Sequence, residues 1–427
     1  MNPYLMILLA VSYIFYALLD IRAFPVLIIM SLLTYAGGRI IFSKKQDPSK
    51  KNDVAKVITL SFIAVEVAIL CFFKYSSLFM LPVGMSFYML MAISFLVDTY
   101  RGEFEKYPSV VEVLVYISFF PTVISGPIMK SKDLIPQFEH PKKISRERVN
   151  DALWMVLIGA FLKLVMANRL CVAVDKVYAT PLVFSGLTLF LTSVTYTLQL
   201  LFDFAGYSYM AIGVSKALGF DIMQNFNLPY LAANPSEFWR RWHISLSSWL
   251  KDYVYIPLGG NRRGSFRTYI NIFIVMVLSG LWHGSTVNFL IWGILHGLGQ
   301  IVYRAFTVNK KDTAGKTRRI LSVIINFLFV NFLWIPFRAP DLKTTWTIFT
   351  RIVTMKCGAS YYYVYTFIFA VMLIIVYIIG ARRFNGNDPL KPLPLGKLYA
   401  KIIFCVILIM IGMFAYFGNG AFIYAQF

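Results

Sequence analysis

The sequence predicts an all-α, polytopic membrane protein. Of its 427 residues, 58% are hydrophobic and only 14% are charged, whereas soluble domains carry about 25% charged residues. Long apolar runs recur along the whole chain, and a helix needs about 20 such residues to cross the hydrocarbon core. We therefore expect roughly ten transmembrane helices, with re-entrant and interfacial helices, in one integral-membrane domain over residues 1–427.

Hydropathy locates the individual apolar runs. The first run has no Lys or Arg before it and no small-residue cleavage site, so we expect a transmembrane helix and not a removable signal peptide. Some of the later runs are too short to cross a bilayer alone. The runs are 4–19, 24–42, 57–73, 80–97, 112–128, 152–172, 183–202, 270–306, 320–337, 345–355, 362–380 and 400–424.

Basic loops between these runs predict the topology. The positive-inside rule places Lys- and Arg-rich loops on the cytoplasmic side, and the rule applies to 43–56, 130–148, 237–268, 308–319 and 381–397. The runs 112–128 and 270–306 then enter and leave on one face.

Both of these runs contain helix breakers. Pro121 and Pro127 interrupt the first, and Gly280 and Gly284 interrupt the second just before the polar stretch 285–288. Broken backbone at membrane depth survives only where protein or a water-filled cavity satisfies its polar groups. The sequence thus predicts two re-entrant segments beside an internal cavity.

The formal net charge of +21 is explained by this topology, so we expect no nucleic-acid partner. The same loops can attract anionic membrane lipid or a phosphorylated cytoplasmic donor.

The cysteines and histidines do not have the spacing of metal sites. No CxxC pair occurs, so we expect buried free thiols and no zinc cluster or disulfide framework. The histidines lack HxxxH and HExxH spacing, and no metal site is expected. The cysteines are Cys71, Cys171, Cys357 and Cys405.

An amphipathic helix is predicted to begin near Pro235, after cap chemistry supplied by Asn234. At about 100° per residue, its apolar side chains form one stripe, and we expect the helix to rest at the cytoplasmic interface with its tryptophans at headgroup depth. The stripe consists of Trp239, Trp242, Leu246, Trp249 and Leu250.

Two histidines are candidate site residues. His283 lies in an apolar segment between Gly280 and Gly284, where an ionisable side chain is costly, so a functional role is favoured over packing. His243 lies at the border of the amphipathic stripe, one turn before Ser247, and spacing alone leaves function and packing equally open. His296 and His140 are expected to be a packed and a solvated histidine.

Other sequence patterns are weaker evidence for a functional site. The sequence "GGNRRG" lacks the spacing of a phosphate loop. Asp203 ends an apolar run, and pairing with a Lys or Arg is favoured over a binding role. A transporter stays open as an alternative because broken helices also build transport sites, although no internal repeat is visible.

Several long motifs, in order, resemble the membrane-bound O-acyltransferase (MBOAT) family, and within it the bacterial branch that contains the membrane subunit of alginate O-acetyltransferase. The resemblance has its core at about 80–300. The motifs are "PVGMSFYMLMAISFLVDTYRG" (82–102), "FFPTVISGPI" (119–128), "LFDFAGYSYMAIGVSKALGF" (201–220), "NFNLPYL" (225–231), "EFWRRWHISLSSWLKDYVYIPLGGNR" (237–262) and "LSGLWHG" (278–284).

The resemblance implies a helical bundle around a central tunnel in the bacterial cytoplasmic membrane. It implies an enzyme that takes an acyl group, commonly from acetyl-CoA, on the cytoplasmic side. An extracytoplasmic partner then O-acetylates an exopolysaccharide or cell-wall glycan. No bound cofactor is expected.

The resemblance also assigns roles to residues. The family's invariant histidine corresponds to His283, the expected general base, and its second polar position corresponds to His243. The donor site or tunnel mouth is expected to include Arg240, Arg241, Trp242, Ser247, Lys251, Asp203 and Asn227. The alternative within the family is a D-alanyl transfer protein of the teichoic-acid pathway.

Overall fold

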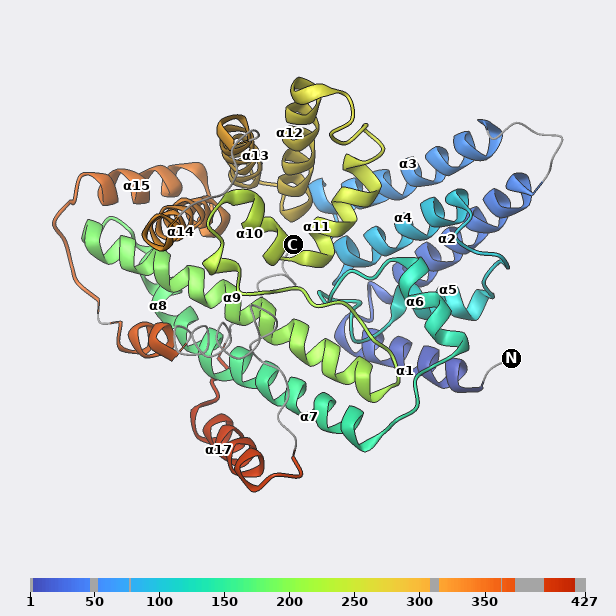
Figure 1. The fold of residues 1–427 in the computed structure, drawn as a ribbon, viewed down its shortest axis with the longest axis horizontal. Helices are drawn as coiled ribbons and strands as arrows, with labels where there is room; N and C mark the ends of the chain where they lie inside the picture. Colours follow the sequence, from blue (N-terminus) through green and yellow to red (C-terminus); the bar gives the residue numbers. More distant parts are fainter. Residues whose placement is uncertain are drawn as a thin grey trace. The chain divides into compact units, whose positions relative to one another are not determined.

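The computed structural model describes residues 3–46, 53–76, 78–307, 315–361, 363–372 and 395–418 (Figure 1). These residues form helices, and the only β-pairing among them is an isolated bridge between Phe184 and Ala359. Seven of the helices are long and apolar enough to cross a membrane, and two shorter apolar helices accompany them. The predicted all-α membrane fold is confirmed. The basic segments 308–314 and 381–394 lie outside the described residues.

The chain divides into two compact units. The first contains the described residues up to Val156 together with Met210–Met223, and the second contains Leu157–Tyr209 and the described residues from Gln224 onward. A single membrane domain stays a prediction.

The first unit is built mainly from its N-terminal helices. Helix α4 forms the core of the unit, because almost all of its side chains are buried. Gly84 and Gly102 bound α4 and adopt positive φ values of 73° and 81°, which glycine tolerates without steric cost. The helices are α1 (Pro3–Leu19), α2 (Phe24–Lys45), α3 (Asp53–Tyr75), α4 (Met85–Arg101), α5 (Val110–Ser118) and α6 (Ser131–Glu139).

The break predicted in the run 112–128 is present. Ser109 and Glu112 form a capping box at the start of α5, and α5 ends at Ser118, before Pro121. Irregular backbone continues to residue 130. The re-entrant path of this segment stays a prediction.

Most of the remaining elements lie in the second unit, although residues 146–156 and 210–217 of two long helices belong to the first. Helix α7 (Arg146–Ala160), the π-helix η1 (Phe161–Ala167) and α8 (Asn168–Ala179) form one continuous helical stretch. The remaining elements are α9 (Gly186–Ala217), η2 (Pro229–Leu231), α10 (Pro235–Arg241), α11 (Ile244–Leu250), η3 (Lys251–Tyr255), α12 (Gly264–His283), α13 (Val287–Thr307), α14 (Lys316–Arg338), α15 (Leu342–Val353) and α17 (Leu398–Phe414).

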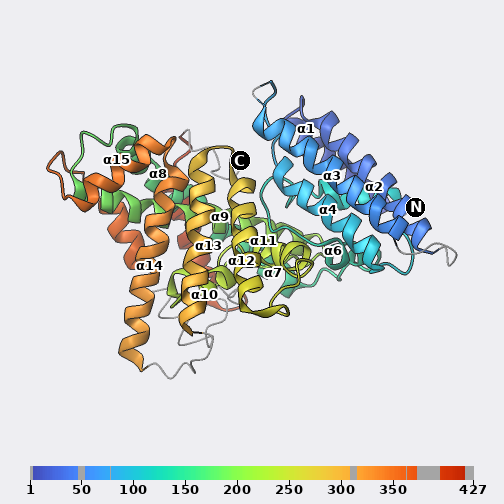
Figure 2. The same ribbon diagram turned by 90° about the horizontal axis from the view of Figure 1, so that it is seen from above.

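The prediction of one broken segment at 270–306 is wrong in its details. The segment forms two helices, α12 and α13, each long enough to cross a membrane. Residues 284–286 join them into a hairpin, and Figure 2 shows α12, α13 and α14 side by side. The polar residues that suggested a mid-membrane break therefore form the connection between two helices.

The prediction of one lipid-facing helix after Pro235 is also wrong. Asn234 does cap α10 by accepting a hydrogen bond from the Glu237 N–H at 2.8 Å, but the helix stops at Arg241 and α11 starts at Ile244. The three tryptophans of the stripe are at most 9% exposed, because they pack inside the protein and do not reach headgroups.

The cysteines depart from expectation as well. All four are free thiols, but Cys71, Cys357 and Cys405 are exposed and Cys171 is partly buried. The apolar context of Cys71 and Cys405 reflects exposed helix surfaces and not a protein core, and Cys357 lies in the irregular stretch after α15.

Candidate active site

His283 is the last residue of α12 and is only 2% exposed. Its ring packs against Trp292 of α13 and Phe337 of α14, with centroid distances of 5.1 and 5.2 Å. The chain turns at once after it, and a Cβ at Gly284 would lie 2.1 Å from the Phe289 ring. The glycine after His283 is therefore required by close packing.

His243 lies between α10 and α11 with a left-handed backbone, at φ 45°. This conformation is uncommon for a residue with a side chain, and a neighbouring extended segment supports it. Asn225 accepts hydrogen bonds from the Ile244 N–H through its carbonyl (2.9 Å) and from the Ser245 N–H through Oδ1 (3.2 Å). Asn225 thus fixes the break that positions His243.

The two histidines come together although forty residues separate them in the chain. Their ring centroids are 6.5 Å apart, and His243 also packs edge-on against Phe204 of α9 at 4.6 Å. His243 is fully buried and lies outside the seven candidate spans. Burial lowers its pKa to about 3, so its imidazole is neutral at physiological pH.

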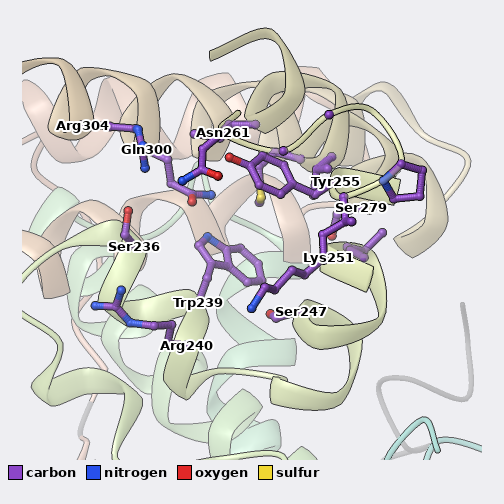
Figure 3. A pocket seen from close by; sticks show the side chains of 18 of the residues that line it. Ser236, Trp239, Arg240, Ser247, Lys251, Tyr255, Asn261, Ser279, Gln300 and Arg304 are labelled. Carbon is purple, nitrogen blue, oxygen red and sulfur yellow. The ribbon is translucent and has the colours of Figure 1, made fainter. Parts of the chain in front are cut away.

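A cavity of about 920 Å³ lies beside these residues in the second unit. It is formed by α10, α11, η3, the loop 256–263, and the facing sides of α12 and α13. In Figure 3, Trp239 stands between Arg240 and Lys251, with its indole directed toward Asn261 and Gln300.

The cavity is lined by positive charge. Its lining residues all lie in the continuously described range 78–307, and none of them is acidic. Its cationic residues are Arg240, Lys251, Arg262, Arg263 and Arg304. Arginine forks and a lysine ammonium on one wall are well suited to a ligand that carries phosphate groups.

One wall of the cavity leads toward His283. Ile272, Met276 and Ser279 line it along one face of α12, at the three- and four-residue spacing that keeps side chains on the same side of a helix. His283 follows Ser279 by four residues, about one helical turn. Ser279 Oγ is buried and has no hydrogen-bond partner among the described residues.

The structure separates the predicted mouth residues into two groups. Arg240, Ser247 and Lys251 line the cavity, as do Arg262 and Arg263. The other four also lie within the described range 78–307 but do not line the cavity. They are Arg241, Asn227, Trp242 and Asp203.

Those four make structural contacts. Arg241 pairs with Glu237 at 2.7 Å, and the Asn227 N–H donates to the Arg241 carbonyl at 2.9 Å. Trp242 packs between Phe226 and Trp334, with centroids at 5.0 and 5.1 Å. Asp203 forms an ion pair with Lys163, which confirms the predicted pairing of Asp203 with a Lys or Arg.

Several cavity residues were not foreseen. Gln300 and Arg304 come from α13, and Tyr255, Asn261 and Ser279 were not singled out. Arg304 and Gln300 are four residues apart, which puts them on one helix face, but only the hairpin reveals that this face meets α10. No group of three or more His, Cys, Asp or Glu side chains in the described part of the chain could hold a metal ion.

The family described as MBOAT, membrane-bound O-acyltransferase family, matches residues 13–339. The chain belongs to this family. It is therefore a membrane-bound O-acyltransferase, and the transporter alternative is set aside.

Several curated proteins are similar to the chain over much of its length. A probable alginate O-acetylase AlgI of Azotobacter vinelandii is 34% identical over 92% of this chain and 82% of its own length. A peptidoglycan O-acetyltransferase of Helicobacter pylori is 31% identical, over 83% and 74%. A teichoic acid D-alanyltransferase of Bacillus subtilis is more distant, at 28% identity over 58% and 66%.

Proposed function

We propose that this MBOAT enzyme takes an acetyl group from a thioester donor, such as acetyl-CoA, on the cytoplasmic side of a bacterial cytoplasmic membrane. The acetyl group then serves the O-acetylation of a polysaccharide outside the cell. The observation that carries the proposal is the cationic cavity that leads along α12 to the histidine pair. The names of the alginate and peptidoglycan relatives support acetyl as the group and a glycan as the final acceptor.

The cavity accounts for donor binding. Phosphate groups of the donor bind Arg240, Lys251 and Arg304, while the thioester lies along α12 near Ser279. The Ser279 hydroxyl, which is buried without a partner, donates to the thioester carbonyl. A hydrogen bond aimed at the developing oxyanion lowers the barrier of acyl transfer.

His283 acts as the general base. It removes the proton from the acceptor hydroxyl, the hydroxyl oxygen attacks the thioester carbon, and the carbon–sulfur bond breaks. The departing thiolate takes up the proton from the His283 imidazolium, which returns the histidine to its neutral form. His243 contributes a neutral N–H that orients the acceptor or polarises the carbonyl, because its lowered pKa keeps it uncharged. General-base catalysis contributes about 10²–10⁴-fold.

The charge distribution supports a cytoplasmic donor site. Arg262, Arg267 and Arg304 lie at the end of the α12–α13 hairpin opposite its turn, and positive loops face the cytoplasm. The turn, with His283 beside it, then faces the outer side. An extracytoplasmic glycan-modifying partner receives the acetyl group there.

The test is acyl transfer by purified protein supplied with labelled acetyl-CoA. We expect His283→Ala to reduce thioester turnover by about 10²–10⁴-fold, while the matched control His140→Ala, at an exposed histidine, keeps wild-type turnover. Equal turnover by wild type and His283→Ala would refute the role of His283. If wild type ignores acetyl-CoA but accepts a D-alanyl carrier protein, the chain is a D-alanyl transferase instead.

A further inference from the structure

A cluster of buried aromatic rings holds polar atoms that have no partner among the described residues. Trp239, Trp292 and Trp334 each leave Nε1–H without a hydrogen-bond acceptor, and His296 leaves both ring nitrogens unpaired. His296, Trp292 and Trp334 are fully buried, and Trp239 is 9% exposed. We call these four residues the ring cluster.

The ring cluster lies between the cavity and His283, and all of its members belong to the second unit. Trp239 lines the cavity and packs edge-on against His296 at 5.0 Å. His296 contacts Trp292 at 4.8 Å, and Trp292 contacts His283 at 5.1 Å. Of the four, only Trp239 lines the cavity, so a ligand arm that leaves the cavity at Trp239 on its way to His283 would contact this cluster.

Packing alone does not explain these side chains. Buried polar groups are nearly always hydrogen-bonded, and an unsatisfied one costs about 1–3 kcal/mol. His296 is surrounded by the rings of Phe238, Phe329 and Trp334, an apolar setting in which phenylalanine would fill the space without that cost. The polar edges therefore indicate a partner that arrives with a ligand.

The chemistry of the unpaired atoms identifies the class of ligand. Three indoles supply three N–H donors, and a neutral imidazole supplies one donor and one acceptor. An amide group offers the complement, because its carbonyl accepts and its N–H donates. A chain of amides, as in the pantetheine arm of a thioester donor, matches the cluster better than an alkyl chain does.

We propose that the ring cluster binds the amide-bearing arm of the donor and that His296 is a positioning residue for it. This inference rests on the proposed function, because it presumes a thioester donor in the cavity. Its arm reaches past Trp239, and the hydrogen bonds to its amides hold the thioester near His283.

The test compares donors with and without amides. Acetyl-CoA and S-acetyl-N-acetylcysteamine carry amides next to the thioester arm, whereas ethyl thioacetate carries none. We expect His296→Phe to raise KM for the two amide donors by about 3- to 10-fold, the effect of losing one neutral hydrogen bond. The ratio of kcat/KM for an amide donor to kcat/KM for ethyl thioacetate should therefore fall by the same factor. Thermal stability should stay equal or rise.

Three further variants distinguish a loss of hydrogen bonds to the donor's amides from a loss of packing around His296. His296→Gln keeps a donor and an acceptor and should recover part of the affinity, and Trp239→Phe, which removes an indole N–H at a side chain that lines the cavity, should repeat the amide-specific loss. Phe329→Leu, which disturbs packing beside His296 but removes no polar atom, should lower stability without changing the preference among donors.

The outcomes are distinct. If wild type turns over thioesters and His296→Phe keeps the wild-type ratio between amide and non-amide donors, the inference is wrong while the function stands. If wild type acts on none of the thioesters, the proposed function fails and the inference fails with it. An acetylated pantetheinyl carrier protein, run beside acetyl-CoA, distinguishes a protein-bound arm from a free coenzyme.

Discussion

His243 combines a left-handed backbone, complete burial and a pKa lowered by desolvation. A folded-state pKa of about 3, against the ordinary histidine pKa of 6.5, means that the unfolded chain binds the proton more readily at intermediate pH. His243 therefore makes stability greatest above pH 6.5, and the stability falls as the pH drops toward 3. The physical cause is that a charged imidazole cannot be hydrated at this site.

The corresponding prediction concerns pH-dependent unfolding. In the wild-type protein, protonation of His243 should lower the free energy of unfolding by roughly 1.4 kcal/mol for each pH unit below 6.5. His243→Asn should remove this contribution, so the free energy of unfolding of the variant should fall less steeply with decreasing pH. Melting temperatures in detergent at pH 7.5, 6 and 4.5 would measure it. The exposed His140→Asn variant should keep the wild-type slope, and an unchanged slope in His243→Asn would contradict the buried neutral imidazole.

Among the helices, the α12–α13 hairpin packs with its backbones in direct contact. A Cβ at Gly280 would lie 2.4 Å from the Phe289 carbonyl oxygen, and one at Gly293 would lie 2.5 Å from the Met276 carbonyl oxygen. Small residues permit such close approach between membrane helices. The hairpin thereby holds His283 of α12 beside Trp292 of α13.

Alanine substitutions test this contact. Gly280→Ala and Gly293→Ala should each lower stability by about 1–3 kcal/mol through overpacking and reduce acyl transfer, because the helices must separate. The matched control is Gly297→Ala on α13, where a Cβ would meet only ordinary contacts at 3.4 Å. This control should be neutral or slightly stabilising. Equal melting temperatures for Gly280→Ala and Gly297→Ala would refute the close contact.

The same elements show what the sequence could predict. Most helix positions and the candidacy of His283 followed from apolar runs and from the cost of a histidine within one. The break at His243 did not, because the spacing of Trp239, Trp242 and Trp249 continues a helical stripe through it, and the Asn225 contacts that cause the break are tertiary. For the same reason, burial of these tryptophans in protein could not be told from burial in lipid.

At the scale of the whole molecule, the orientation of the protein in the membrane can be tested directly. In a background with the native cysteines replaced by serine, we expect Ser285→Cys, in the exposed hairpin turn, to react with a membrane-impermeant maleimide in intact cells. Asn261→Cys, at the exposed cavity loop, should react only after the cells are opened. The reverse pattern would place the cavity outside and remove the basis for a cytoplasmic donor.

The cavity wall on α12 also sets the distance between the donor's anchor and the catalytic histidine. From Ile272 to His283 the helix advances roughly 16 Å at about 1.5 Å per residue, and the glycine contact with α13 keeps this length rigid. A donor anchored by its phosphates must therefore have an arm of matching reach. Selectivity among thioesters would then depend on arm length as well as on charge, and an enzyme engineered for shorter donors would need a new anchor nearer His283.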